Sequence, residues 1–278
     1  MSGRLRQIAR QTVTITESGR YRNDIGDEVV IADAVRAAVA GTRHYLPDET
    51  ITLAYGQAGT CTVEVTDEST LLAARRLGPG AAALVFASAR NPGGGFLNGA
   101  QAQEESIARS SALYACLRAA PDFYAFHRAQ QDLRYSDRIV YSPDVPVFRD
   151  DNGNLLDQPY TTSLLTAAAP NLGAIVRNQP DHTGDVPAVL ARRARRILEV
   201  AATHGHRGLV LGAWGCGVFR NDAAIVADAL ARVLDAVAHF DHVVFVIRDN
   251  LPGTPVHAAF AQRFSLTTDE RTSGHPRG

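Results

Sequence analysis

The sequence predicts an α/β fold in which a mixed sheet is sandwiched by helices and an N-terminal helical extension precedes the sheet. Three patterns in the 278-residue chain support this prediction. Helical and strand-like segments alternate from residue 186 to residue 264, residues 81–89 form a continuous apolar run, and an Asn-Gly turn separates two apolar segments in the middle of the chain. Alternation of this kind is typical of a largely parallel or mixed sheet covered by helices.

The extension is expected over residues 1–58, and a helix is predicted within it at 26–46. Apolar residues recur there at helical spacing, at Val30, Ala34, Val35, Ala38 and Val39. The core of the fold is expected over residues 59–265, and residues 266–278 are expected to form a flexible tail. The chain shows no internal repeat and no low-complexity linker, so we expect one domain over residues 1–278.

The first part of the core predicts a strand, a glycine-rich loop and a helix in that order. Residues 60–69 alternate in polarity like a strand whose end caps a helix at 71–78. The apolar run 81–89 is typical of a strand buried on both faces. Three glycines follow it, and residues 102–120 then show near-helical spacing with two glutamates in the first turn, where the helix dipole favours them.

The second part of the core begins with a predicted hairpin. Residues 137–148 and 155–169 read as two strands, because an Asn-Gly turn between apolar runs is a strong hairpin signal. Asp150 and Asp151 are explained as part of that solvated turn. Helices are then predicted at 186–205, 222–240 and 254–264, and strands at 208–214 and 242–249. The arginine run 192–196 is expected to form a solvated helix face.

Composition excludes several classes of function. The formal net charge is −1, so we expect no extended nucleic-acid-binding surface. All 28 basic residues are arginine. P-loops, Schiff-base enzymes and lysyl-adenylate nucleophiles are therefore excluded, because each needs a lysine amine. Any phosphate contact made by a charged side chain must come from arginine.

Cysteine, histidine and N-terminal patterns indicate a simple intracellular protein. The three cysteines lie far apart without CxxC pairing, so neither a disulfide framework nor a zinc knuckle is expected. The nine histidines show no metal-ligand spacing, and we expect no metal and no cofactor. The N-terminus carries early charges and lacks an apolar signal region, and no apolar run approaches the length of a membrane span. A cytoplasmic location without a membrane partner is expected.

Two predicted strand-to-helix connections are rich in glycine, at residues 91–100 and 212–222. Ligands of open α/β sheets lie beyond the carboxyl ends of the strands, where glycine lets backbone N–H groups approach an anion. Neither segment is a GxGxxG motif or a P-loop, which disfavours an ordinary dinucleotide dehydrogenase. Two such loops suit one ligand that carries a diphosphate.

The spacing of these residues resembles a known family. Three glycines, seven residues and Gln-Glu-Glu, at 93–105, resemble the signature of poly(ADP-ribose) glycohydrolases, and GAWGCGVFRND is similar to the diphosphate loop of their compact bacterial, macrodomain-like type. TVTITESGRY and LVFASARNPGGGFLNGAQAQEES are similar to stretches of the same group, so the resemblance covers most of the chain. It implies an enzyme that hydrolyses ribose–ribose O-glycosidic bonds and reverses ADP-ribosylation in the DNA damage response. Its implied partners are poly(ADP-ribose), ADP-ribose and ADP-ribosylated proteins.

The resemblance also implies roles for individual residues. Glu105 matches the general acid and base, since one glutamate can protonate the leaving oxygen and then activate water, and Glu104 would hydrogen-bond ribose hydroxyls. The remaining implied contacts are with the distal ribose and the diphosphate, by Asn91, Gly93, Gly94, Gly95, Gln103, Gly215, Gly217, Val218, Phe219 and Arg220. Phe219 would pack on the distal ribose, although plain core packing explains it equally well, and Arg220 is either a phosphate contact or an exposed loop arginine.

Three questions stay open at this level. The start of a helix lowers the pKa of a carboxyl group, whereas a general acid works best with a raised one, so the protonation of the glutamate pair is not fixed by the sequence. A hydrolase of mono-ADP-ribosylated protein or DNA would carry similar loops, and a non-catalytic ADP-ribose reader would not require the glutamates. The bacterial type further implies cleavage from the polymer end, with residues 248–264 capping the far ribose.

Overall fold

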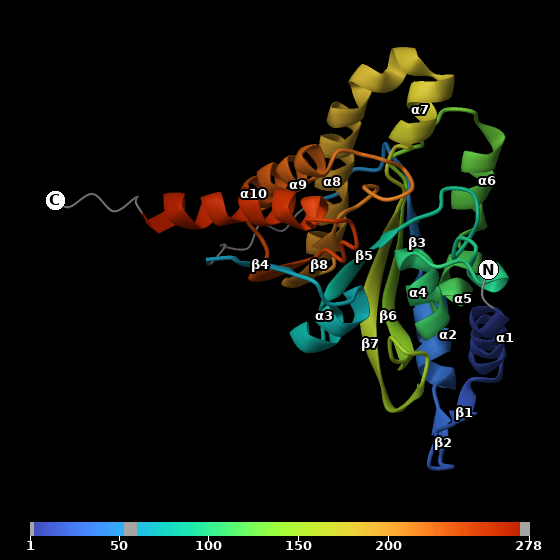
Figure 1. Cartoon of the computed structure of the whole chain (residues 1–278). Helices are drawn as coiled ribbons and strands as arrows, with labels where there is room; N and C mark the ends of the chain where they lie inside the picture. The colour runs from blue at the N-terminus through green and yellow to red at the C-terminus, as the bar shows by residue number, and fades with distance from the viewer. Residues whose placement is uncertain (1–2, 53–59, 273–278) are drawn as a thin grey trace.

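The computed structural model describes residues 3–52 and 60–272. Its centre is a seven-stranded mixed sheet (Figure 1). The strand order is β3 (Arg43–Tyr45), β6 (Ile139–Arg149), β7 (Leu155–Ala167), β5 (Ala82–Phe86), β8 (Gly208–Gly212), β9 (His242–Val246) and β4 (Thr62–Thr66). The strands from β7 to β4 run parallel, and β6 is antiparallel to both of its neighbours. The predicted hairpin is therefore confirmed, and it joins β6 to β7.

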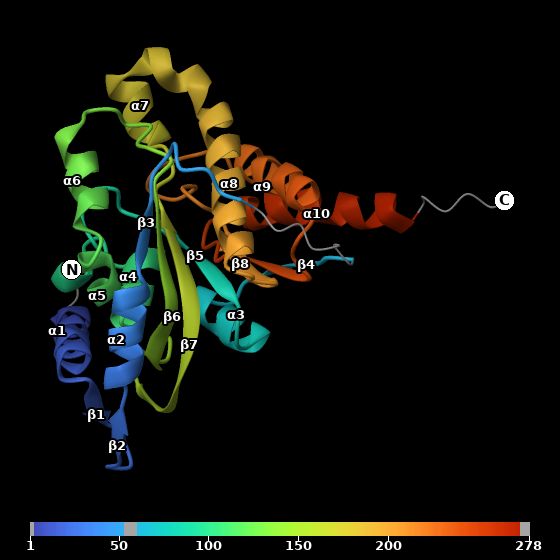
Figure 2. The ribbon, with the colours of Figure 1, turned by 180° about the vertical axis from the view of Figure 1, so that it is seen from behind.

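Helices cover both faces of the sheet (Figure 2). One layer contains α7 (Leu172–Asn178), the 3₁₀ segment η2 (Pro180–Asp185), α8 (Val186–Thr203), α9 (Ala223–Val237) and α10 (Pro255–Thr272). The other contains α1 (Gly3–Ser18), α2 (Ala32–Gly41), α3 (Thr70–Leu77), α4 (Gln103–Ser110), α5 (Leu113–Arg118) and α6 (Pro121–Ala129). None of the described helices is both long and apolar enough to cross a membrane.

Strand β5 shows why the sheet holds two hydrophobic cores. Ala82 and Leu84 belong to the cluster beneath α8 and α9, whereas Ala83 and Val85 belong to the cluster beneath α2 and α5. All four side chains are 0 % exposed. Successive side chains of a strand point to opposite faces, so a continuous apolar run is what a strand covered on both sides requires. The predicted buried strand is confirmed over Ala82–Phe86, and residues 87–89 of the apolar run belong to the following loop.

The helix predicted at 26–46 is shorter than expected. Within 26–46 the structure has α2 flanked by two strands, β2 (Glu28–Val30), which pairs with β1 (Arg20–Arg22), and β3, which is an edge of the main sheet. Val29 pairs with Tyr21 and Tyr45 with Ile139. β-Branched and aromatic residues favour such pairing, and it outweighs the helical spacing at both ends of the segment.

Two further predictions are corrected. The helix expected at 102–120 is divided at Ser111, whose backbone is extended and pairs with Val147 of β6, while its hydroxyl accepts a hydrogen bond from the N–H of Leu113. The arginine run 192–196 is not wholly solvated, because Arg193 is 1 % exposed and forms an ion pair with Asp137. At the C-terminal end, α10 continues to Thr272 into the expected tail, of which residues 273–278 lie outside the described part.

Candidate active site

The first glycine-rich loop leaves the carboxyl end of β5 and turns back toward α4. The N–H of Gly94 donates to the carbonyl of Asn91 at 3.0 Å, and Gly93 and Gly94 have φ angles of 69° and 59°. Residues with a Cβ atom rarely adopt such angles, so this turn depends on glycine. The 3₁₀ segment η1 (Phe96–Asn98) follows, and the buried ring of Phe96 anchors it against Ala9 and Ala108.

Both glutamates of α4 hold this loop through hydrogen bonds. Glu104 accepts from the N–H of Ser88 at 2.6 Å on one oxygen and from the N–H of Gly93 at 3.1 Å on the other. Glu105 accepts from the N–H of Gly95 at 3.0 Å through Oε1. The side chains therefore diverge onto different parts of one loop, as neighbouring helical positions about 100° apart allow. Acceptors for bare N–H groups explain why three glycines and two carboxylates occur so close together.

The two carboxyl groups lie in different surroundings. Glu104 is 2 % exposed, and Glu105 is partly exposed. Burial raises the pKa of Glu104 well above its usual range, and the charge of Glu105 adds to the rise. The N–H groups of Ser88 and Gly93 oppose it, because they favour the ionised form. A buried carboxyl with a raised pKa therefore lies beside a partner that solvent and ligand can reach.

Gln103 connects the start of α4 to β5. Its side-chain oxygen accepts from the N–H of Phe86 at 2.9 Å, and its amide group donates to the carbonyl of Leu84 at 2.7 Å and to the hydroxyl of Thr70 at 3.2 Å. The side chain of Gln103 thus bonds to the backbone of β5 beyond Ala83, where the pairing of β5 with β8 ends. These bonds fix the first turn of α4 against the end of the sheet.

The second glycine-rich loop follows β8. A Cβ atom on Gly215 would lie 2.5 Å from Cβ of Ala169 and 2.5 Å from the amide nitrogen of Asn221, so this position also requires glycine. Asn221 in turn donates to the carbonyls of Pro170 and Gly215. Gly217 has no atom within 4 Å of its Cβ position, and Val218 is 85 % exposed. The base of the loop is fixed, and its tip is open to a ligand.

A groove of about 840 Å³ is bordered by the second loop and by residues on either side of the first loop, Ala87 and Gln101–Gln103. Gly93–Gly95, Glu104 and Glu105 are not among its lining residues. This volume suits a nucleotide-sized ligand. Its lining includes Ala169, Gly215 and Phe219, as well as Phe86 and Gln103. Further walls come from α1 (Leu5, Ile8), the start of α3 (Glu68–Leu71), α4 (Ser106, Ile107, Arg109, Ser110), the hairpin turn (Asp150–Gly153) and the segment after β9 (Arg248–Leu251).

Comparisons with known proteins identify the family. A sequence profile described as microbial-type PARG, catalytic domain, matches residues 9–150. The chain belongs to the microbial-type poly(ADP-ribose) glycohydrolase (PARG) family. It is a hydrolase of the glycosidase class that acts on poly(ADP-ribose). A search of curated protein sequences found no significant match.

Solved PARG structures resemble nearly the whole chain. The poly(ADP-ribose) glycohydrolase of Thermomonospora curvata is 51 % identical over 95 % of this chain and 100 % of that chain, with a TM-score of 0.90. The same protein bound to the inhibitor ADP-HPD is 52 % identical over the same shares, with a TM-score of 0.88. A PARG from Deinococcus radiodurans in complex with ADP-ribose is 42 % identical over 86 % of this chain and 99 % of that chain, with a TM-score of 0.78.

The residues predicted from the PARG resemblance occupy three kinds of position. Gly93, Gly94 and Gly95 contact the two glutamates, and Gln103 lines the groove, as do four residues of the second loop, Gly215, Gly217, Val218 and Phe219. The groove-lining residues do not include Asn91, Gly93, Gly94, Gly95, Glu104, Glu105 or Arg220. Asn91 is exposed at the turn of the first loop, and the aliphatic part of Arg220 lies along Gly173 of α7.

Several walls of the groove were not anticipated from the sequence. The start of α3 was expected only as a capped helix, and Ser69 does cap it by accepting from the N–H of Leu72 at 3.1 Å. α1 was not expected to border a site, and neither was the hairpin turn. Asp150 accepts three hydrogen bonds within that turn, from Asn152 and Asn154. Among the described residues, no group of three or more His, Cys, Asp or Glu side chains is placed to hold a metal ion.

Proposed function

We propose that this PARG-family enzyme removes single ADP-ribose units from the end of poly(ADP-ribose), with Glu105 as general acid and base. The observation that carries the proposal is the position of Glu105. Its carboxyl group lies against the glycine loop at the carboxyl end of β5, and no described residue bonds to its Oε2. That oxygen is available to the scissile bond of a ribose held beneath the loop.

The chemistry needs one carboxyl group used twice. The carboxylic acid of Glu105 protonates the departing ribose oxygen as the C1–O bond breaks, and the positive charge develops on the ribose ring. The resulting carboxylate then removes a proton from water as that water attacks C1. Free ADP-ribose and a polymer shorter by one unit result, and Glu105 is again protonated. General acid–base catalysis of this kind contributes roughly 10² to 10⁴-fold.

Glu104 acts chiefly by holding the loop in this proposal. Both of its oxygens already accept backbone N–H groups, and little of the side chain is exposed. A carboxylate offers about four acceptor positions, so a ribose hydroxyl can still add to those two bonds. Contact between Glu104 and the ribose remains a prediction, with Asn91 and Gly93–Gly95 around the same sugar.

The second loop would bind the diphosphate. Gly217 and Val218 line the groove, where their N–H groups would meet the diphosphate. Phe219 also lines the groove and is half-buried, and its ring would pack on the distal ribose. Arg220 is not a groove-lining residue, and a phosphate contact by its guanidinium remains a prediction. ADP-ribosylated proteins are the proposed carriers of the polymer.

The segment after β9 supports cleavage from the polymer end. Arg248, Asn250 and Leu251 line the groove, and Asp249 fixes their turn by accepting from the N–H groups of Val256 and His257 at the start of α10. A wall at this place blocks a polymer that continues past the bound unit. The decisive test of the proposed function is release of ADP-ribose from purified polymer by the wild-type protein and by Glu105→Gln.

A further inference from the structure

Phe219 has an aromatic neighbour outside the two glycine loops. The ring of Tyr135 lies 5.9 Å from the ring of Phe219, between centroids, at an angle of 45°. Tyr135 also packs on a small apolar cluster made of Ala87, Ala89 and Ala168. Ala87 and Ala89 begin the first loop, and Ala168 directly follows the end of β7. One side chain therefore contacts the start of the first loop and Phe219 of the second.

The backbone of Tyr135 is strained, with a φ angle of 59°. A bulky residue rarely takes a left-handed conformation, and strain of this kind persists where the surrounding structure imposes it. Tyr135 also lines a cavity of about 360 Å³ together with Arg134, Asp185 and Arg193. Apolar packing therefore does not enclose the ring on every side, and its position must be fixed by the loop that carries it.

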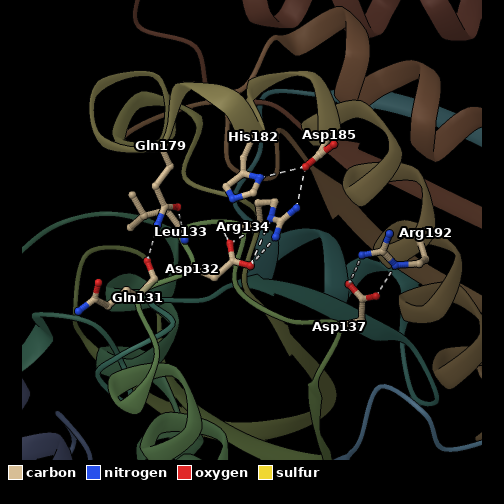
Figure 3. A network of polar contacts seen from close by, with 9 residues as sticks. All are labelled: Gln131, Asp132, Leu133, Arg134, Asp137, Gln179, His182, Asp185 and Arg192. Carbon is tan, nitrogen blue, oxygen red and sulfur yellow. Dashed lines mark hydrogen bonds and ion pairs between the residues drawn. The ribbon is translucent and has the colours of Figure 1, made fainter.

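Polar contacts hold that loop on both sides of Tyr135 (Figure 3). Arg134 forms a forked pair with Asp132, at 2.8 and 3.0 Å, and reaches Asp185 before α8 at 2.6 Å. Such planar, two-bonded pairs fix geometry better than single contacts do. On the other side, Asp137 binds Arg192 and the buried Arg193 of α8.

The same loop is joined to the segment that holds Phe219. Leu133 accepts from the N–H of Asn171 at 2.9 Å, and its own N–H donates to Gln179 at 3.0 Å. Two residues beyond Asn171, the N–H of Gly173 donates to the carbonyl of Phe219 at 2.9 Å. The backbone of Phe219 and the backbone of the Tyr135 loop are thus tied to one connection, between β7 and α7.

We propose that Tyr135 is a positioning residue for the ligand clamp: its ring packs on the ring of Phe219 and holds Phe219 in its place at the groove. The inference rests on the proposed function, in which Phe219 packs on the distal ribose. Without the ring, Phe219 has no aromatic support on this side and can withdraw from the groove. The strained conformation of Tyr135 is then part of the binding geometry.

Tyr135→Gly tests this directly, because glycine accepts the φ angle and removes only the ring. Aromatic contacts of this kind contribute enough to predict a loss of about tenfold in affinity for ADP-ribose, measured by calorimetry. Tyr135→Phe keeps the ring and should bind like the wild type. Asp144→Gly is the matched control, since Asp144 also has a positive φ, of 42°, but is exposed in β6 away from the groove.

A double-mutant cycle separates positioning from general stability. If Tyr135 acts through Phe219, then Tyr135→Gly adds no further loss of affinity to Phe219→Ala, whereas a merely structural role gives additive losses. Trp214, the sole tryptophan, lies in the first part of the second loop, and its emission reports whether that loop has shifted in the folded variant. Wild-type affinity in Tyr135→Gly, failure of Tyr135→Phe to restore binding, or additive losses would each overturn the inference. Normal binding by Phe219→Ala would instead refute the clamp of the proposed function.

Discussion

A Cβ atom on Gly94 would lie 2.4 Å from Oε1 of Glu105. Real Cβ atoms do not approach an oxygen so closely, and the φ angle of Gly94 already disfavours any other residue. The φ angle thus favours glycine at the middle of the triplet, and any side chain there would also displace the carboxyl group of Glu105, before any ligand binds. The binding loop and the catalytic residue form one unit.

Glu105→Gln should lower turnover of poly(ADP-ribose) by roughly 10² to 10⁴-fold while the affinity for ADP-ribose changes little. The amide oxygen can still accept the N–H of Gly95, so the loop keeps its anchor. Turnover and calorimetry on the same preparation check both parts. Glu28→Gln, an exposed change on β2, is the control. Near-normal turnover in Glu105→Gln would move the catalytic role elsewhere.

Substitutions of two glycines should have different consequences. Gly217→Val should remove binding of ADP-ribose in a protein that folds normally, because its Cβ position is open and the new side chain enters the diphosphate site. Gly94→Val should also displace Glu105, and so lower the thermal midpoint. Gly184→Val in η2, equally open but not a groove residue, is the control for calorimetry and melting. Normal binding by Gly217→Val would place the diphosphate elsewhere.

Stability should depend on pH through Glu104. A carboxyl group whose pKa is raised by folding binds more protons in the folded state, so the free energy of unfolding falls as pH rises above the ordinary value of 4.5. Glu104→Gln removes this dependence. Denaturant titrations between pH 4 and pH 8 should show the wild type losing stability relative to the variant as pH increases. The opposite trend would mean that the N–H bonds from Ser88 and Gly93 outweigh burial.

Arg193→Met should destabilise the fold by about 3–5 kcal/mol, because it leaves the carboxylate of Asp137 without its buried partner. Arg193 also donates to the carbonyl of Ala168 at 2.5 Å, and that bond is lost too. Arg192 forms an ion pair with the same Asp137, but its side chain is largely exposed. Arg192→Gln should therefore lower the free energy of unfolding by less than about 1 kcal/mol. Chemical denaturation measures both. Equal effects would contradict the role of burial.

Cleavage should proceed from the polymer end. Long chains on automodified protein, sampled at early times, should yield mostly single ADP-ribose and leave the protein-linked unit in place. The reaction should depend weakly on salt, because the chain has no extended basic track. A ladder of released oligomers would refute this mode of attack, and clearance of the protein-linked unit would indicate mono-ADP-ribosyl hydrolysis.

Local pattern was enough to predict the strand, glycine loop and helix around the glutamates. The apolar run of β5 shows burial on both faces, and the glycines show a bare backbone. The features that the sequence pattern did not predict depend on residues distant in the sequence. Ser111 divides a helix because β6 lies beside it, and Arg193 is buried because Asp137, 56 residues earlier, meets it. The burial of Glu104 likewise depends on a loop that folds back over the side chain, which no local spacing indicates.

The hydrogen bonds from the loop to Glu104 and Glu105 also limit how this protein could evolve. Replacement of either glutamate by a residue with a shorter, apolar side chain would remove an anchor of the first glycine-rich loop together with the activity. Inactivation would thus not leave a ready-made ADP-ribose reader. Replacement by glutamine keeps a side-chain oxygen that can accept the N–H of the loop. A PARG-family enzyme would therefore evolve into a non-catalytic ADP-ribose-binding protein most easily through glutamine at these positions.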